Sequence, residues 1–165
     1  FLLIFLKTNA NNNIAFIDLD FIAKNSILGK SVTSQIKQKK DIFNDEISKN
    51  KKQLKDKEKK IISQKNILDE NQFKIKIDEL RNMIKEYQVE KERKNKEFSV
   101  FSSKANNQIL TLISPILDNY SKKNSISIIF QKKHIVTGRN DLDITSDILK
   151  KLNIKIKKID LSKIK

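Results

Sequence analysis

Apolar residues recur at heptad spacing through residues 30–114, a segment that contains no glycine and no proline. Two such series predict two long helices, because positions three and four apart lie on one side of a helix. A turn predicted near Asn66–Gln72 would let the helices pack as an antiparallel hairpin. The first series is Ile36, Phe43, Ile47, Leu54, Ile61 and Leu68, and the second is Phe73, Ile77, Leu80, Ile84, Tyr87, Phe98, Phe101, Ala105 and Leu112.

The seam between these helices is thin. Polar residues stand at several positions where a regular heptad pattern would place apolar ones. We therefore expect helices that are individually marginal and mobile, with fast amide exchange near the turn. The interrupting residues are Lys40, Asn50, Lys57, Gln64, Lys91 and Lys94.

Short β-branched segments flank the helical region. Ile14–Ile17 predicts one strand, and the alternation of Ile126, Ile128 and Phe130 predicts another. Gln131-Lys132-Lys133 would turn the chain, and His134–Val136 would return as the partner strand of a hairpin. These segments predict a small β core.

Helix boundaries follow from caps and breakers. Gly29 interrupts the first apolar pattern, so Ser31 or Thr33 is the expected cap of the first long helix. Pro115 is expected to kink the second helix or to split off a short final one. A last helix, capped by Asp143 or Thr145, is expected to run through Leu152.

The predicted fold class is therefore α+β, with a long, coiled-coil-like antiparallel helical hairpin inserted into a small β core. The core would be discontinuous, formed by residues 14–29 and 115–153. The hairpin arm would span residues 30–114, and residues 154–165 would form a basic tail.

Composition adds a strong positive charge. The formal net charge is +15 and the pI is about 9.8. An anionic partner is indicated: nucleic acid, acidic lipid or an acidic protein. The only arginines are Arg81, Arg93 and Arg139, which is few for a dedicated nucleic-acid binder. The chain has no cysteine, which excludes disulfides, thiolate metal sites and cysteine nucleophiles.

The first residues form an unbroken apolar run, Phe1–Leu6, followed by small and polar residues. The run is too short to cross a bilayer. We interpret residues 1–10 as the remnant of a signal peptide whose start is truncated, with Thr8 and Ala10 near a cleavage site. A buried strand is the alternative, and the three asparagines after the run argue against it.

Candidate reactive groups are few, and each has a structural explanation. His134 is the only histidine and has no evident nucleophile partner. Asp18 with Asp20, and Asp141 with Asp143, have the spacing of metal ligands but fit turn and capping roles better. No glycine-rich phosphate loop is present. We therefore expect no catalytic residue, no cofactor and no metal, and interpret the chain as a non-enzyme.

Both ends of the chain carry motifs of a known family. Ile14-Ala15-Phe16-Ile17-Asp18 with Gly29-Lys30, and the Ile126–Val136 hairpin followed by Asp143-Ile144-Thr145 and Leu152, resemble the Skp/OmpH-like periplasmic chaperones. The resemblance implies a homotrimer in which strands of three subunits form the β core and three helical hairpins surround a cavity. It also implies a periplasmic holdase that binds unfolded outer-membrane proteins without ATP.

This resemblance assigns roles to two sets of residues. Strands shared between subunits would bury the trimer core, and the arms would contact clients weakly at many points. Anionic lipid or lipopolysaccharide is a further expected contact of the arms, and nucleic acid is not expected. The trimer core would be Ile14, Phe16, Ile126, Ile128, Phe130 and Ile135, and the client contacts Lys52, Lys55, Lys59, Lys60, Ile62 and Ile75.

The alternative is a basic coiled-coil protein that binds nucleic acid or acts as a tether. Phosphate binding would weaken steeply with added salt, whereas capture of apolar clients would persist.

Overall fold

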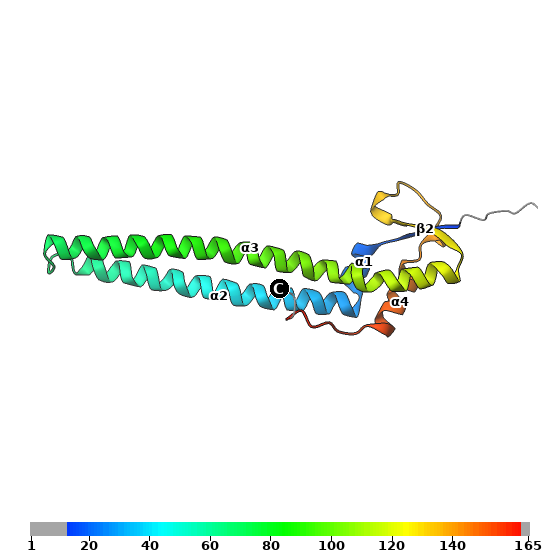
Figure 1. Ribbon diagram of the computed structural model, residues 1–165, viewed down its shortest axis with the longest axis horizontal. Helices are drawn as coiled ribbons and strands as arrows, with labels where there is room; N and C mark the ends of the chain where they lie inside the picture. Colours follow the sequence, from blue (N-terminus) through cyan, green and yellow to red (C-terminus); the bar gives the residue numbers. More distant parts are fainter. Residues whose placement is uncertain (1–12, 163–165) are drawn as a thin grey trace, which may run out of the picture. The chain divides into compact units, whose positions relative to one another are not determined.

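A computed structural model describes residues 13–162 of the chain (Figure 1). The signal-peptide remnant predicted at residues 1–10 lies outside the described residues. Among residues 13–162 helices dominate, and a single sheet of two strands is present. In chain order the elements are β1 (Asn13–Ile17), α1 (Leu19–Asn25), α2 (Ile27–Ser63), α3 (Glu70–Lys123), β2 (Ile126–Gln131), the 3₁₀ turns Lys132–His134 and Asn140–Leu142, and α4 (Thr145–Lys155).

The described residues divide into two compact units. The first comprises residues 13–33 and 106–161, and the second is centred on residues 34–105. The second unit is an antiparallel helical hairpin of α2 and α3 (Figure 1). Its turn is closed by Asp69, whose carboxylate accepts a hydrogen bond from the Gln72 backbone N–H at 2.9 Å and so caps α3. The predicted turn is thus confirmed.

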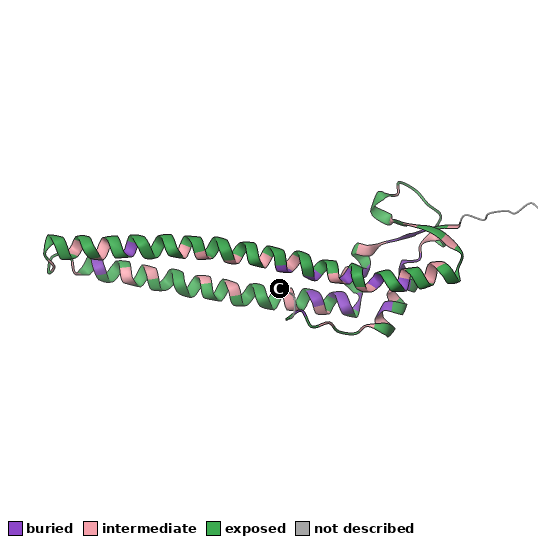
Figure 2. Cartoon of the chain, viewed as in Figure 1, coloured by how far each residue is buried: buried purple, intermediate pink, exposed green. Residues whose placement is uncertain are grey.

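The predicted apolar seam also lies between the two helices. Ile61, Leu80, Phe101 and Ala105 are buried, and most other seam residues are half-buried. Ile84 is an exception, since it is 37% exposed. Exposed residues predominate on both helices of this unit (Figure 2). The hairpin therefore buries a narrow stripe and little else.

The first unit contains the well-packed core. β1 is buried along Ala15, Phe16 and Ile17, which is typical of a strand covered on both faces. Asp18 follows the strand and caps α1 by accepting a hydrogen bond from the Phe21 N–H at 2.8 Å. Other buried apolar side chains of this unit include Ile144, which precedes α4, and residues of the four described helices: Ile22, Leu28, Val32, Ile109, Ile113, Ile116, Ile148 and Leu152.

The predicted β-hairpin at Ile126–Val136 is wrong. β2 ends at Gln131, the 3₁₀ turn Lys132–His134 follows, and residues 135–136 are not in a strand. The partner of β2 is instead β1, in parallel, with Phe16 opposite Phe130. Gln-Lys-Lys lacks the left-handed residues that a tight hairpin turn requires, and β1 offers a buried, β-branched partner from across the chain.

The predicted start of the first long helix is also wrong. α2 begins at Ile27, and Gly29 lies inside its first turn. Ser26, fully buried, caps this turn by accepting a hydrogen bond from the Gly29 N–H at 2.9 Å. α3 continues past Pro115 to Lys123, so no separate final helix forms there. α4 confirms the predicted last helix and extends it to Lys155, but the predicted cap is wrong: Thr145 is the first helical residue and Ile144 is the N-cap.

Gly29 is required by a close approach of backbone. A Cβ atom at this position would lie 1.8 Å from the Ala23 carbonyl oxygen of α1. We expect Gly29→Ala to lower the free energy of unfolding by about 1 to 3 kcal/mol, because α1 and α2 must move apart. Denaturant unfolding followed by circular dichroism measures this, with Ser34→Ala at an exposed position of α2 as the control. Equal stability of the two variants would contradict the packing account.

Candidate functional site

The positive charge of the hairpin is concentrated around its turn. Residues 49–76, here called the arm end, carry ten lysines and four acidic residues, whereas residues 34–48 and 77–105 together are nearly neutral. Lys52, Lys55 and Lys59 are spaced three and four residues apart, so they share one side of α2. All three are exposed, as is Lys60. Within residues 13–162 no ion pair engages these four lysines.

Exposed apolar side chains stand among these lysines. Ile62 is 58% exposed, Ile67 in the turn is 82% exposed, and Ile75 near the start of α3 is 59% exposed. Single exposed isoleucines are ordinary on a protein surface. Three of them within one short, basic stretch give the arm end both long-range charge and short-range apolar contact.

The charges on α3 are balanced locally. The Arg81 guanidinium pairs with the Asp78 carboxylate at 2.9 Å, and Arg93 pairs with Glu90 at 2.5 Å and with Glu97. The hydrogen bond from Arg93 lowers the pKa of the Glu90 carboxyl. This part of the hairpin therefore neutralises itself, and the unpaired lysines named above on α2 dominate the field of the unit.

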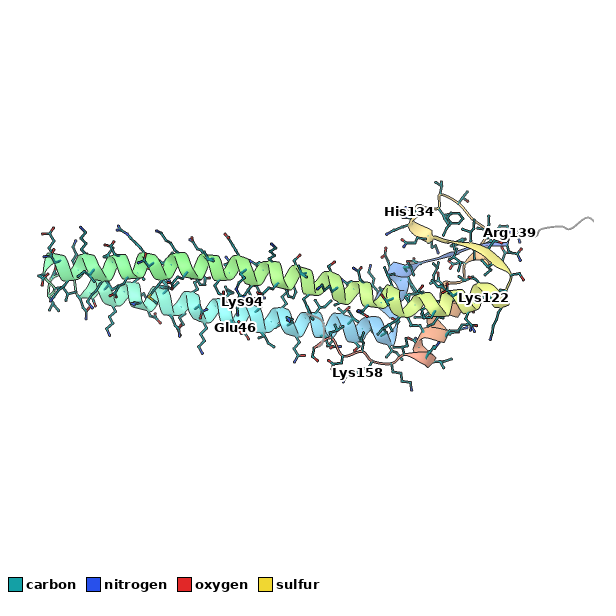
Figure 3. The ribbon with its side chains drawn as sticks, viewed as in Figure 1. Glu46, Lys94, Lys122, His134, Arg139 and Lys158 are labelled. Atoms are coloured by element: carbon teal, nitrogen blue, oxygen red, sulfur yellow. The ribbon has the colours of Figure 1, made fainter. Side chains whose placement is uncertain are left out.

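The middle of the hairpin is loosely packed. A gap of about 180 Å³ lies between the helices, lined by Ile42, Phe43, Phe98 and the paired side chains of Glu46 and Lys94. Figure 3 shows Glu46 on α2 and Lys94 on α3 facing each other. Lys94 thus occupies a predicted seam position, with an ion pair where apolar packing would otherwise lie.

The residues expected in a trimer core fall into three groups. Phe16 is buried within the first unit, and Ile126 is half-buried in β2. Ile14, Ile128 and Phe130 are each close to half exposed on the sheet. Ile135 is half-buried but follows the 3₁₀ turn, so its predicted place in a return strand is wrong.

Three of the four aspartates with metal-like spacing, Asp18, Asp141 and Asp143, hold local structure through hydrogen bonds or ion pairs. Besides Asp18, Asp143 accepts hydrogen bonds from the Thr145 N–H at 3.0 Å and from the Lys132 ammonium at 2.8 Å. Burial raises the pKa of Asp143, but these hydrogen bonds outweigh it and leave the pKa lowered. Asp141 pairs with Arg139. Over residues 13–162 no group of three or more metal-ligating side chains is found.

One concave feature escaped the sequence analysis. A hollow of about 420 Å³ lies between the last turns of α3 and α4, both in the first unit. Helical spacing of Tyr120 with Lys123, and of Lys151 with Lys155, places these pairs on common helix faces. The sequence could not reveal that the two faces meet, because that depends on how α4 packs.

Among the helices that the structure describes, none has the length and apolar character needed to cross a membrane.

One comparison with known proteins identifies a family, and another identifies a similar fold. A family model described as outer membrane protein (OmpH-like) matches residues 13–152. A crystal structure of a candidate outer membrane chaperone (OmpH-like) from Caulobacter crescentus has a similar fold, with a TM-score of 0.84. The two sequences are 16% identical, and the alignment covers 90% of this chain and 88% of the other. No curated protein sequence matches the chain.

The gap in the seam can be filled by a substitution. Lys94→Leu should fill part of the gap beside Phe43 and Phe98 and raise the free energy of unfolding of the hairpin by about 1 kcal/mol, because it adds apolar burial. Amide exchange of residues 90–101 measures the gain as slower opening. Lys96→Leu, at an exposed position of the same helix, is the control and should give none. Faster exchange in Lys94→Leu would mean that the ion pair, not packing, holds the middle of the hairpin.

Proposed function

The chain belongs to the OmpH-like outer membrane protein family, and we propose that it is a chaperone that keeps unfolded outer-membrane proteins soluble in the periplasm without ATP. The observation that carries this proposal is the arm end. It combines exposed, unpaired lysines with exposed isoleucines on a thin helical hairpin. The sequence has no glycine-rich nucleotide loop, which fits a cycle driven by client folding or transfer.

Charge and apolar contact would have separate roles. Exposed lysines attract an acidic client over about 10 Å at 0.1 M salt and so raise the rate of encounter. Ile62, Ile67 and Ile75 would then hold apolar segments weakly. Several weak contacts on linked arms give strong overall retention without a rigid site, which suits clients of varied sequence.

Self-association would supply several arms at once. β2 is paired with β1 on one edge, and no other strand of the described residues covers its second edge. Ile128 and Phe130 stand half exposed on this strand. An uncovered strand with apolar side chains favours pairing with another chain. We infer that the chain forms a homotrimer through this sheet.

The trimer is tested by Phe130→Asp. Phe130 is 44% exposed within one subunit, so the subunit should fold with aspartate there, whereas a shared core would bury the new charge at high cost. Sedimentation velocity should show a folded monomer for the variant and a trimer for the unmodified chain. Val136→Asp, at a fully exposed apolar position outside the sheet, should remain trimeric. A monomeric unmodified chain would refute the assembly.

The chaperone function is tested by diluting a denatured, acidic β-barrel protein with and without the chain and recording light scattering. Suppression of aggregation near one trimer per client is expected. Failure to suppress it would overturn the proposal and favour the alternative of a nucleic-acid-binding or tethering protein. Binding to nucleic acid that falls steeply with salt would identify that alternative.

Two variants separate the roles of charge and apolar contact in the same assay. Replacing Lys52, Lys55, Lys59 and Lys60 with Gln should slow client capture at low salt and matter little at high salt. Replacing Ile62 and Ile75 with Ser should leave the capture rate unchanged and speed release, because these side chains supply contact without charge. The division of roles is wrong if the lysine variant loses capture equally at all salt concentrations.

A further inference from the structure

The hollow between the last turns of α3 and α4 has the features of a small-molecule site. We call it the Tyr120 hollow. Its volume of about 420 Å³ is in the range of small-ligand pockets. α3 contributes Ile116, Asn119, Tyr120 and Lys123, Asn124 follows α3, and α4 contributes Lys151, Ile154 and Lys155.

Three side chains give the Tyr120 hollow an apolar surface, beside the amides of Asn119 and Asn124. Ile116 is buried, and the ring of Tyr120 is half-buried. The Tyr120 hydroxyl donates a hydrogen bond to the Asp147 carboxylate at 2.8 Å, so its polar end is already satisfied and the ring is left for apolar contact. Ile154 is 80% exposed beside this surface. An apolar group placed in the hollow would therefore remove ring and isoleucine surface from water together.

The rim of the Tyr120 hollow is cationic. Lys123, Lys151 and Lys155 are all exposed, and the Lys151 ammonium lies 5.7 Å from the centre of the Tyr120 ring. The acidic partner of Tyr120, Asp147, is a single negative charge against three positive ones. Figure 3 shows Lys122 near the end of α3, one residue before Lys123. The surroundings of the hollow thus favour a negatively charged group.

We propose that the Tyr120 hollow binds an amphiphilic anion, a molecule with one acidic head group on an apolar chain of modest length. The apolar chain lies against Ile116, Ile154 and the Tyr120 ring. The head group is held by the lysine ammonium groups at the rim. Lysine is a point charge without a fixed fork, so the site accepts a carboxylate or another singly charged head group.

A structural role for these lysines accounts for only part of the arrangement. Lysine near a helix C-terminus interacts favourably with the helix dipole, and Lys123 and Lys155 occupy such last turns. The dipole does not explain a largely exposed isoleucine beside an open, aromatic-walled hollow. Because the helix C-termini carry partial negative charge, the anionic head group is expected at the ends of the long lysine side chains, away from the terminal carbonyls.

The test is a titration of the ¹⁵N-labelled full chain with decanoate, followed by amide chemical shifts. Saturable shifts confined to residues 116–124 and 151–155 are expected. Decanol, which lacks the charge, and butyrate, which lacks the chain, should each bind at least about tenfold more weakly, a difference of about 1.4 kcal/mol. Shifts spread over the whole chain, or equal affinity for decanol, would overturn the proposal.

Variants locate the site. Lys151→Glu with Lys155→Glu should weaken decanoate binding about tenfold or more, and Ile154→Ser should weaken it several-fold without changing the charge. Lys85→Glu with Lys96→Glu changes the net charge by the same amount at exposed positions of the hairpin and should leave binding unchanged. Equal affinities of the two glutamate variants would overturn the assignment. The result is independent of the chaperone assay, which uses the arm end.

Discussion

The burial of β1 is the constraint on which the rest of the structure depends. This strand precedes the helical hairpin, yet it pairs with β2, which follows the hairpin more than 100 residues later. On its other edge the Phe16 carbonyl accepts a hydrogen bond from the Ile144 N–H at 3.0 Å. Five residues thus hold together the segments that lead into and out of the hairpin. The core around β1 must supply most of the stability, because closing so long a loop costs conformational entropy.

A stable core permits a weakly packed hairpin. The seam of α2 and α3 keeps lysines, an ion pair and a gap in places where a strong coiled coil would have leucine or isoleucine. Such a seam is less stable than one filled by leucine and isoleucine. The exposed isoleucines of the arm end are separated by charged residues. A continuous apolar stripe there would favour association with other copies of the chain.

Local patterns were enough to predict the hairpin, its turn and β1, because each depends on residues close in sequence. They failed where distant segments meet. Alternation at Ile126–Phe130 identified a strand but could not identify its partner. Residues 134–136 were predicted to pair with this strand, whereas in the structure β1 pairs with it. Gly29 was interpreted as a helix breaker, but it lies inside α2. Glycine is needed there because the Ala23 carbonyl leaves no room for a Cβ atom. The Tyr120 hollow depends on the packing of α4 and left no signal in spacing alone.

The central claim is that the arm end holds clients and the first unit does not. A photo-crosslinking residue at Ile62 or Ile75, compared with one at Val136, tests this most directly, since all three side chains are exposed and apolar. With an unfolded β-barrel protein present, the account predicts strong crosslinks from the two arm positions and few from Val136. Crosslinks that are equal at all three positions, or strongest at Val136, would contradict it.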